Sequence, residues 1–351
     1  MKIGVITQYN YFNYGNRLQN LATQIILENL GHKVQNLVVA PNAILTPVNK
    51  IVPALFPYHL GGRWRAFKRF TKEFLPNTDI IDGKSTNILA EKYGNLDAVM
   101  IGSDQTWNPE FIQNKDHVFA KFIPKEKRFS FATSFGVSQI PEKDKNDFAN
   151  GLNEIKHLSV RETAGAEIVK RLTGKTCTVV IDPTLMLSKQ QWQDLANKSP
   201  VEIPKEKYIF TYFLQKNPAW TEWMQNFAKA HNLKIVNPNK YLGKYFTTDP
   251  LGFVKLLMNA EIVCTSSFHG HAFSMCLEKP FVSFPGSVVG NSRISTLLKL
   301  TGLENRHFEI IDPNCLFKID FEPVRPIIET QRQKAMNFLQ TSLSEIEKEN
   351  K

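Results

Sequence analysis

The chain has 351 residues, with 43 Lys and Arg against 33 Asp and Glu, so its formal net charge is +10. This length exceeds the usual single hydrophobic core and predicts two domains. No apolar run reaches the ~18 residues that a membrane-spanning helix needs, and the four dispersed cysteines match neither a disulfide framework nor a zinc site. The positive charge favours an anionic partner, whether a substrate, a membrane surface or a nucleic acid.

The predicted elements begin with a strand at residues 2–6, a helix that Gly31 ends, and a strand at 34–39. Because this β-α-β opening normally has a right-handed crossover, it predicts a parallel sheet. Further strand-like runs in the same half lie at 98–101, 129–132, 158–160 and 178–181. Residues 2–6 follow no charged leader, so we expect a cytoplasmic protein.

A second β-α-β series follows the polar residues 197–200. Its predicted strands are 208–213, 233–236, 262–265 and 281–284, with helices between them and a last helix near 330–350. The sequence therefore predicts an α/β fold of two Rossmann-like doubly wound domains. We place the domains at 1–198 and 199–326, and a C-terminal helix at 327–351 that crosses back to the first domain.

Four polar clusters each follow a predicted strand. They are Tyr14-Gly15-Asn16-Arg17, Gly102-Ser103-Asp104-Gln105, Ser159-Val160-Arg161-Glu162 and Ser266-Ser267-Phe268-His269-Gly270. In an open α/β sheet, ligands bind outside the carboxyl ends of the strands. We therefore expect the clusters to converge on one cleft for an anionic ligand.

The first three clusters offer anion-binding and sugar-binding groups. Asn16 and Arg17 sit where a strand leads into a helix N-terminus, which suits a carboxylate or phosphate, although Arg17 also fits an ordinary surface position. Asp104 can accept hydrogen bonds from sugar hydroxyls or act as a general base, or it can simply cap a helix. Arg161 is either a second anion clamp or one half of a salt bridge to Glu162.

The loop after Asp104 carries the candidate acceptor-binding residues Gln105, Trp107 and Asn108. An indole ring gives a pyranose an apolar face to stack on. The alternative interpretation places Trp107 in the hydrophobic core.

The fourth cluster joins hydroxyl groups to an imidazole at a helix start. Ser267 is expected to bind the donor, and His269 either to transfer a proton or to bind the donor, the alternative being a structural histidine. Arg293 adds a cation at the start of a later helix. No G-x-G-x-x-G motif and no metal-ligand spacing occurs, so we expect no dinucleotide, metal or other cofactor.

The chain carries six short motifs, at residues 14–20 (YGNRLQN), 102–109 (GSDQTWNP), 159–162 (SVRE), 182–185 (DPTL), 267–270 (SFHG) and 291–294 (NSRI). Together these motifs resemble the polysaccharide pyruvyl transferase family over residues 2–303. The resemblance implies a fold similar to type B (GT-B) glycosyltransferases, with the site in a cleft that both domains face. It also implies transfer of pyruvate from the substrate phosphoenolpyruvate to a sugar as a cyclic ketal, with release of phosphate.

The resemblance has one departure at the fourth cluster. Many members carry Arg-Leu-His-Gly where this chain has Ser267-Phe268-His269-Gly270, so we hypothesise that Arg293 or Arg17 supplies the missing charge. Family acceptors are often lipid-linked saccharides or cell-wall polymers, which implies an acceptor of that kind. Two other functions remain open: a nucleotide-sugar-dependent glycosyltransferase of similar fold, and a non-catalytic saccharide-binding protein.

Residues 61–76 interleave basic and aromatic side chains. This pattern is typical of a helix lying on an anionic membrane and predicts peripheral contact at its inner face, the alternative being a packed helix with a solvated basic side. Elsewhere the basic residues are spread along the chain and no nucleic-acid-binding module occurs, so we expect no nucleic acid partner.

Overall fold

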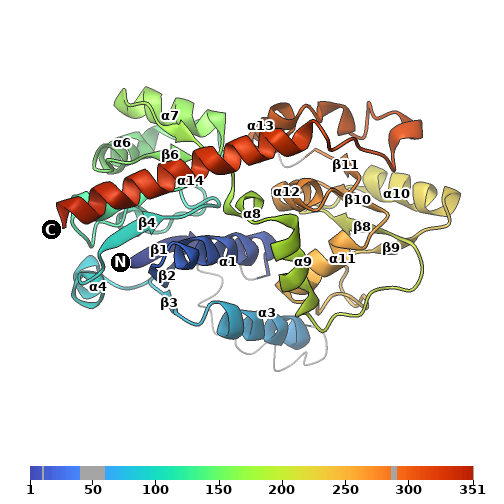
Figure 1. Ribbon diagram of the computed structural model, residues 1–351, viewed down its shortest axis with the longest axis horizontal. Coiled ribbons are helices and arrows are strands. Elements are labelled where there is room, and N and C mark those ends of the chain that lie inside the picture. Colours follow the sequence, from blue (N-terminus) through green and yellow to red (C-terminus); the bar gives the residue numbers. More distant parts are fainter. Residues whose placement is uncertain (10–11, 40–59, 286–290, 351) are drawn as a thin grey trace. The chain divides into compact units, whose positions relative to one another are not determined.

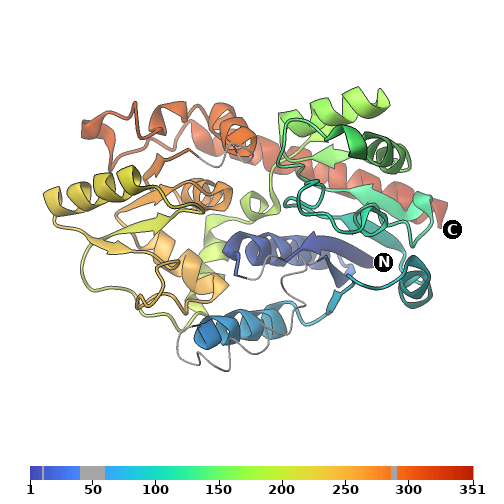
Figure 2. The same cartoon turned by 180° about the vertical axis from the view of Figure 1, so that it is seen from behind.

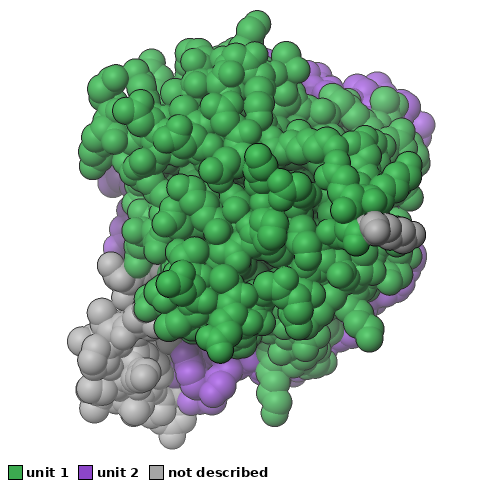
Figure 3. All heavy atoms as spheres, turned by 90° about the vertical axis from the view of Figure 1, so that its left-hand side faces the viewer, with its two compact units in different colours: residues 1–49, 71–186, 329–351 green, residues 50–70, 187–328 purple. Residues whose placement is uncertain are grey.

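The computed structural model describes residues 1–9, 12–39, 60–285 and 291–350 (Figure 1). The chain forms two compact units, which Figure 3 colours separately. Unit 1 comprises Met1–Asn49, Thr71–Met186 and Glu329–Lys351, and unit 2 comprises Lys50–Phe70 and Leu187–Ile328.

The main sheet of unit 1 is parallel, with strand order β3-β2-β1-β4-β5. Its strands are β1 (Lys2–Gln8), β2 (Lys33–Val39), β3 (Thr78–Ile80), β4 (Ala98–Ile101) and β5 (Arg128–Ser130). A separate parallel pair joins β6 (Ser159–Val160) to β7 (Thr178–Val179). The helices are α1 (Tyr14–Asn29), α4 (Thr86–Tyr93), α5 (Lys115–Val118), α6 (Lys145–Asn153), α7 (Thr163–Thr173) and α8 (Pro183–Met186).

The strand order of unit 1 fixes where a ligand site belongs. The chain order runs outward in one direction from β1 to β2 and β3, and in the other through β4 and β5. The carboxyl ends of β1 and β4 therefore flank the switch point, where open α/β sheets hold their ligands. Helix α1 starts just beyond β1 (Figure 2), and its Asn13 cap accepts a hydrogen bond from the amide of Asn16 at 3.3 Å.

Unit 2 repeats the arrangement with a four-stranded parallel sheet in the order β11-β10-β8-β9. Its strands are β8 (Tyr208–Tyr212), β9 (Lys234–Val236), β10 (Ile262–Thr265) and β11 (Phe281–Ser283). Its helices are α9 (Lys189–Asn197), α10 (Pro218–Ala230), α11 (Pro250–Met258), α12 (Phe268–Cys276) and α13 (Asn291–Thr301), with α3 (Leu60–Phe74) contributed as far as Phe70. Here the switch point lies between β8 and β10.

The unit boundary falls at Met186 and Leu187, before the residue 198 boundary of the sequence analysis. The reason is helix α9, which packs on α11 of unit 2. Trp192 of α9 is fully buried, and its ring meets Phe273 edge-on with centroids 4.8 Å apart. Burying a side chain of this size stabilises the packing by about 1.5–3 kcal/mol or more.

The last helix, α14 (Val324–Glu349), belongs to unit 1 from Glu329 onward. Its buried apolar side chains on that stretch are Ala335, Leu339, Leu343 and Ile346. Phe338 stacks on Phe131 with ring centroids 6.4 Å apart. This apolar stripe at helical spacing covers part of the unit 1 core.

Candidate active site

At the switch point of unit 1, the first two polar clusters are in direct contact. The amide Nδ2 of Asn16, in the first turn of α1, donates to Oδ2 of Asp104 beyond β4. The other carboxylate oxygen of Asp104 accepts from the backbone N–H of Gln105 at 2.9 Å. Asp104 itself has φ +71°, a left-handed conformation that costs a non-glycine residue of the order of 1 kcal/mol or more.

Arg161 joins this cluster from the end of β6. Its Nη2 lies 3.6 Å from Oδ1 of Asp104, and its Nη1 donates to Oδ2 of Asp182 at 2.5 Å. The three side chains are all at least 96% buried. Burial alone would lower the pKa of Arg161, but the carboxylates of Asp182, Asp104 and Glu162 together outweigh it and raise that pKa. Arg161 is therefore charged, and the carboxylates of Asp104 and Asp182 that face its guanidinium belong to the protein itself.

Asp182 also belongs to this buried network, although no role was predicted for it. Its Oδ2 also accepts from the hydroxyl of Ser103 at 2.8 Å, and its Oδ1 accepts from the amide and hydroxyl of Thr184 at 2.9 and 2.7 Å. Its sequence signal is an Asp-Pro pair that directly follows the predicted strand at 178–181. Asp182 thus fixes the guanidinium of Arg161 and the loop after β4 together.

Glu162 does not form the salt bridge that was weighed for Arg161. Its Oε1 accepts from the hydroxyl of Ser134 at 3.0 Å and from the amides of Phe135 and Gly136 at 2.9 and 3.2 Å. The two adjacent side chains thus serve different loops.

Arg17 is buried beside the same switch point, only 7% exposed, and does not extend into solvent. Its guanidinium carbon lies 3.3 Å from the ring centroid of Tyr9, a close cation–π contact. Burial lowers the pKa of Arg17 to about 10 and raises that of Tyr9. Arg17 therefore stays cationic at neutral pH, next in sequence to Asn16.

Trp107, in the loop after Asp104, does not present its ring to a ligand. Trp107 is fully buried, its rings packed on Phe119 and Phe135 with centroids 5.7 and 5.2 Å away, and its Nε1 donates to the carbonyl of Val118 at 3.1 Å. The assignment of Trp107 to acceptor stacking is therefore wrong, because the indole belongs to the core.

The two amides of that loop, also expected to bind the acceptor, bond to each other. Nδ2 of the fully buried Asn108 donates to Oε1 of the partly exposed Gln105 at 2.7 Å. Oδ1 of Asn108 accepts from the amide of Glu110 at 2.9 Å. Asn108 therefore shapes the loop, and Gln105 is the member of the pair that reaches the surface.

The fourth cluster lies at the switch point of unit 2. Ser267 precedes the first residue of α12, and its amide donates to Oγ1 of Thr265 at 3.0 Å. His269 occupies the first turn, 5% exposed, with its ring 5.3 Å from that of Phe268. A Cβ on Gly270 would lie 2.2 Å from Oγ1 of Thr265, so only glycine lets α12 approach the strand end this closely.

His271, two residues further along α12, is a structural histidine. Its Nδ1 lies 2.7 Å from the carbonyl oxygen of Ser267, and its Nε2 lies 2.8 Å from the hydroxyl of Ser283 on β11. Complete burial lowers the pKa of His271 to about 4, so the ring is neutral at physiological pH.

Arg293 lies in the first turn of α13 and is 9% exposed. Helix α13 packs against α12, which carries His269. The described structure thus assembles the expected site residues in two groups. Asn16, Arg17, Asp104 and Arg161 gather in unit 1, while Ser267, His269 and Arg293 lie on neighbouring helices of unit 2.

A family model for polysaccharide pyruvyl transferases matches residues 13–287. The chain belongs to the polysaccharide pyruvyl transferase family. The match covers more than three quarters of the chain and contains the four strand-end clusters, and the family is one of transferases. No curated protein matches the chain significantly.

Solved structures of similar fold share little sequence with this pyruvyl transferase family member. The putative UDP-N-acetylglucosamine 2-epimerase of Listeria monocytogenes aligns with a TM-score of 0.52 at 12% identity, over 99% of this chain and 91% of that one. The Methanocaldococcus jannaschii UDP-GlcNAc 2-epimerase gives 0.46 at 12% identity, over 81% and 83%. MurG of Acinetobacter baumannii gives 0.43 at 12%, over 99% and 100%. The first of these likenesses confirms the GT-B-like fold of Rossmann-like units and shows nothing about the substrate.

Most of the basic and aromatic segment 61–76 lies in α3, and part of its apolar side is buried. Phe67 and Phe70 are 3% and 2% exposed, while Arg65, Lys68 and Lys72 are exposed. The other two aromatic side chains of the helix, Trp64 and Phe74, are half-buried. The burial of Phe67 and Phe70 favours the packed helix with a solvated basic side, and peripheral membrane contact stays a prediction.

None of the helices in the described ranges is long and apolar enough to cross a membrane. Among those same residues, no group of three or more His, Cys, Asp or Glu side chains is arranged to hold a metal ion.

Proposed function

We propose that this protein transfers pyruvate from phosphoenolpyruvate to two hydroxyls of one sugar, forming a cyclic ketal and releasing phosphate. The observation that carries the proposal is the family match, which spans the clusters of both units. The buried cations Arg17 and Arg293 support it, because the donor bears both a phosphate and a carboxylate.

The reaction balances without a redox partner. A proton adds to the methylene carbon of phosphoenolpyruvate, which becomes the methyl group, and one sugar hydroxyl bonds to C2 as it develops oxocarbenium character. The C2–O bond to phosphate then breaks, and the second hydroxyl takes its place on C2. Of the two hydroxyl protons, one restores the acid and the other leaves with phosphate.

Residue roles follow from chemistry at each cluster. His269 is assigned proton transfer to the methylene carbon, since an imidazole can hold and release a proton and this one lies at a helix start. Asp104 is assigned as the base toward a sugar hydroxyl, its carboxylate oriented by Asn16 and the amide of Gln105. Arg161 acts as a positioning residue for Asp104, because its own charge already faces two carboxylates.

The deciding experiment offers the purified protein phosphoenolpyruvate and, separately, a panel of nucleotide sugars, each with candidate saccharide acceptors. We expect phosphate release from phosphoenolpyruvate and a product with the ¹³C signal of a ketal carbon. His269→Ala should lower kcat about 10²-fold or more. The control His231→Ala, an exposed histidine of the same unit, should leave kcat unchanged. Consumption of a nucleotide sugar in place of phosphoenolpyruvate would overturn the proposal.

The donor-binding assignment is tested separately. Arg17→Ala and Arg293→Ala should each raise the KM for phosphoenolpyruvate by about tenfold or more, as expected for loss of a charge-assisted contact. An unchanged KM in one variant would remove that arginine from the donor site.

A further inference from the structure

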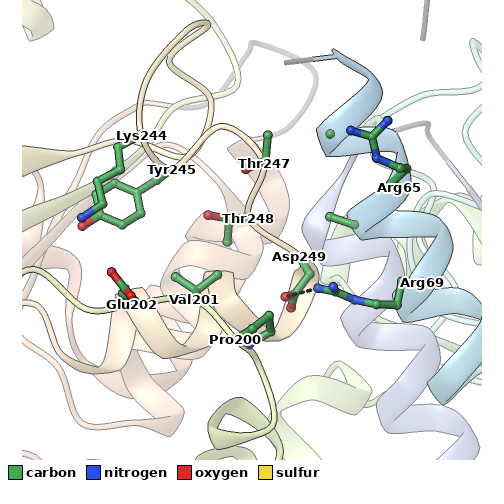
Figure 4. Close-up of a pocket in the computed structure, with 12 residues that line it drawn as sticks. Arg65, Arg69, Pro200, Val201, Glu202, Lys244, Tyr245, Thr247, Thr248 and Asp249 are labelled. Carbon is green, nitrogen blue, oxygen red and sulfur yellow. Dashed lines mark ion pairs between the residues drawn. The ribbon is translucent and has the colours of Figure 1, made fainter. Parts of the chain in front are cut away.

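A cavity of about 720 Å³ lies within unit 2, separate from the residues at the β8 and β10 strand ends. Its walls are α3, residues 200–202 and the loop between β9 and α11, as Figure 4 shows. This volume is within the range of about 300–1,000 Å³ that small-molecule sites occupy. Nothing in the proposed chemistry uses it.

A buried arginine of α3 fixes the cavity walls. Nη1 of Arg63 donates to the carbonyls of Pro238 and Phe246 at 2.6 and 3.3 Å, and Nη2 donates to Oδ1 of Asn239 at 2.8 Å. Arg63 is 3% exposed, and its guanidinium carbon lies 4.7 Å from the ring centroid of Phe246. The helix and the loop are therefore held together without a ligand, which reduces the entropy lost on binding.

The lining carries three cations, Arg65, Arg69 and Lys244, and two anions, Glu202 and Asp249. Both carboxylate oxygens of Asp249 already have partners within the protein. Its Oδ1 caps α11 by accepting from the amide of Gly252 at 2.8 Å, and its Oδ2 accepts from the hydroxyl of Ser199 at 2.8 Å and faces Nη2 of Arg69 at 3.5 Å. The cavity therefore keeps an excess of positive charge that favours an anionic ligand.

The wall opposite α3 adds an aromatic ring and hydroxyls. Figure 4 shows Lys244 and Tyr245 on this side and Arg65 and Arg69 on the other. Tyr245 is half-buried, and Nζ of the exposed Lys244 lies 5.5 Å from its ring centroid. Thr247, also exposed, offers a hydroxyl that both donates and accepts. A ring face, hydroxyls and cations together suit a saccharide that carries a phosphate group.

We propose that this cavity binds a phosphorylated saccharide, with the phosphate toward Lys244 and the sugar against Tyr245. The further identification of that saccharide as the anionic end of the acceptor rests on the proposed pyruvyl transfer. The binding itself does not, because it requires no donor.

The test is calorimetric titration of the full chain, without phosphoenolpyruvate, with glucose 1-phosphate, glucose and a short polyprenyl-diphosphate-linked glucose in detergent micelles. Both phosphorylated probes should bind at least about tenfold more tightly than glucose, because the phosphate adds a charged contact. A preference of about tenfold or more for the lipid-linked probe identifies a lipid-linked ligand, and its absence identifies a free sugar phosphate.

Two charge reversals in one loop give a matched comparison. Lys244→Glu should weaken binding of glucose 1-phosphate by about tenfold or more, while Lys240→Glu should change it less than about twofold. Both lysines are exposed and the net charge changes equally, but Lys240 does not line the cavity. Melting temperatures of both variants should match that of the unaltered protein.

Failure of the cavity proposal is distinct from failure of the proposed function. Absence of saturable binding by both phosphorylated probes, or equal loss in the two variants, overturns the binding site whatever the enzyme does with phosphoenolpyruvate. Binding that depends on Lys244, in a protein that never consumes phosphoenolpyruvate, would keep the site and reject pyruvyl transfer.

Discussion

The buried pair of Arg161 and Asp182 makes the most direct test of the unit 1 network. Asp182→Asn keeps the shape of the side chain and an oxygen for Thr184 but removes the charge 2.5 Å from Nη1 of Arg161. Breaking a fully buried ion pair costs about 3–5 kcal/mol, because one charge stays buried without its partner. Asp104, 3.6 Å from Nη2 of Arg161, compensates part of that loss, so we expect about 2–3 kcal/mol.

Hydrogen exchange followed by mass spectrometry measures this loss within unit 1 alone. In peptides covering β4, 2–3 kcal/mol corresponds to exchange about 30- to 150-fold faster for the most protected amides. The control is Asp79→Asn, which breaks the exposed pair of Asp79 and Lys92 in the same unit. Exposed pairs contribute about 0–1 kcal/mol, so this control should change exchange by less than about fivefold. Equal effects of the two substitutions would refute the claim that burial makes the Asp182 pair strong.

Two further predictions concern unit 2. Gly270→Ala should destabilise unit 2 by about 1–3 kcal/mol, because the new Cβ would lie 2.2 Å from Oγ1 of Thr265. Faster hydrogen exchange in β10 peptides should report this loss. Unchanged protection would show that α12 shifts freely to make room. The stability of unit 2 should be complete above pH ~6.5 and fall by about 2 kcal/mol as the pH drops to 5, since the pKa of His271 is about 4 when folded and ordinary when unfolded. Exchange of β10 amides, corrected for intrinsic rates, should show this decline, and His271→Gln should flatten it; a flat profile in the unaltered protein would contradict the burial argument.

Features of the structure that depend on a local pattern of apolar and polar residues could be predicted from the sequence. Short apolar runs followed by polar clusters located the carboxyl ends of β1, β4, β6 and β10, and hence Asn16, Asp104, Arg161 and His269. Apolar periodicity is a property of a short window, so it survives without knowledge of the tertiary fold.

Partners that depend on strand pairing were not predictable in this way. Arg161 bonds to Asp182, 21 residues away, and not to the adjacent Glu162. The parallel pairing of β6 with β7 brings the ends of both strands to one edge, and no local pattern encodes that pairing. Trp107 was misread for a related reason, because its burial depends on Phe119 and Phe135, which approach it only in the folded unit.

Unit 1 is built from separate stretches of the chain, and this has a consequence for its synthesis on the ribosome. Its residues up to Met186 emerge well before Glu329, and all of Leu187–Ile328, which belongs to unit 2, is made in between. At about 5–20 residues per second, that interval lasts roughly 7–30 s. During it, Phe131 lacks Phe338, and the apolar surface that α14 will cover remains open to chaperones or to other nascent chains. The second unit can finish folding first, so the order of folding need not follow the order of the chain.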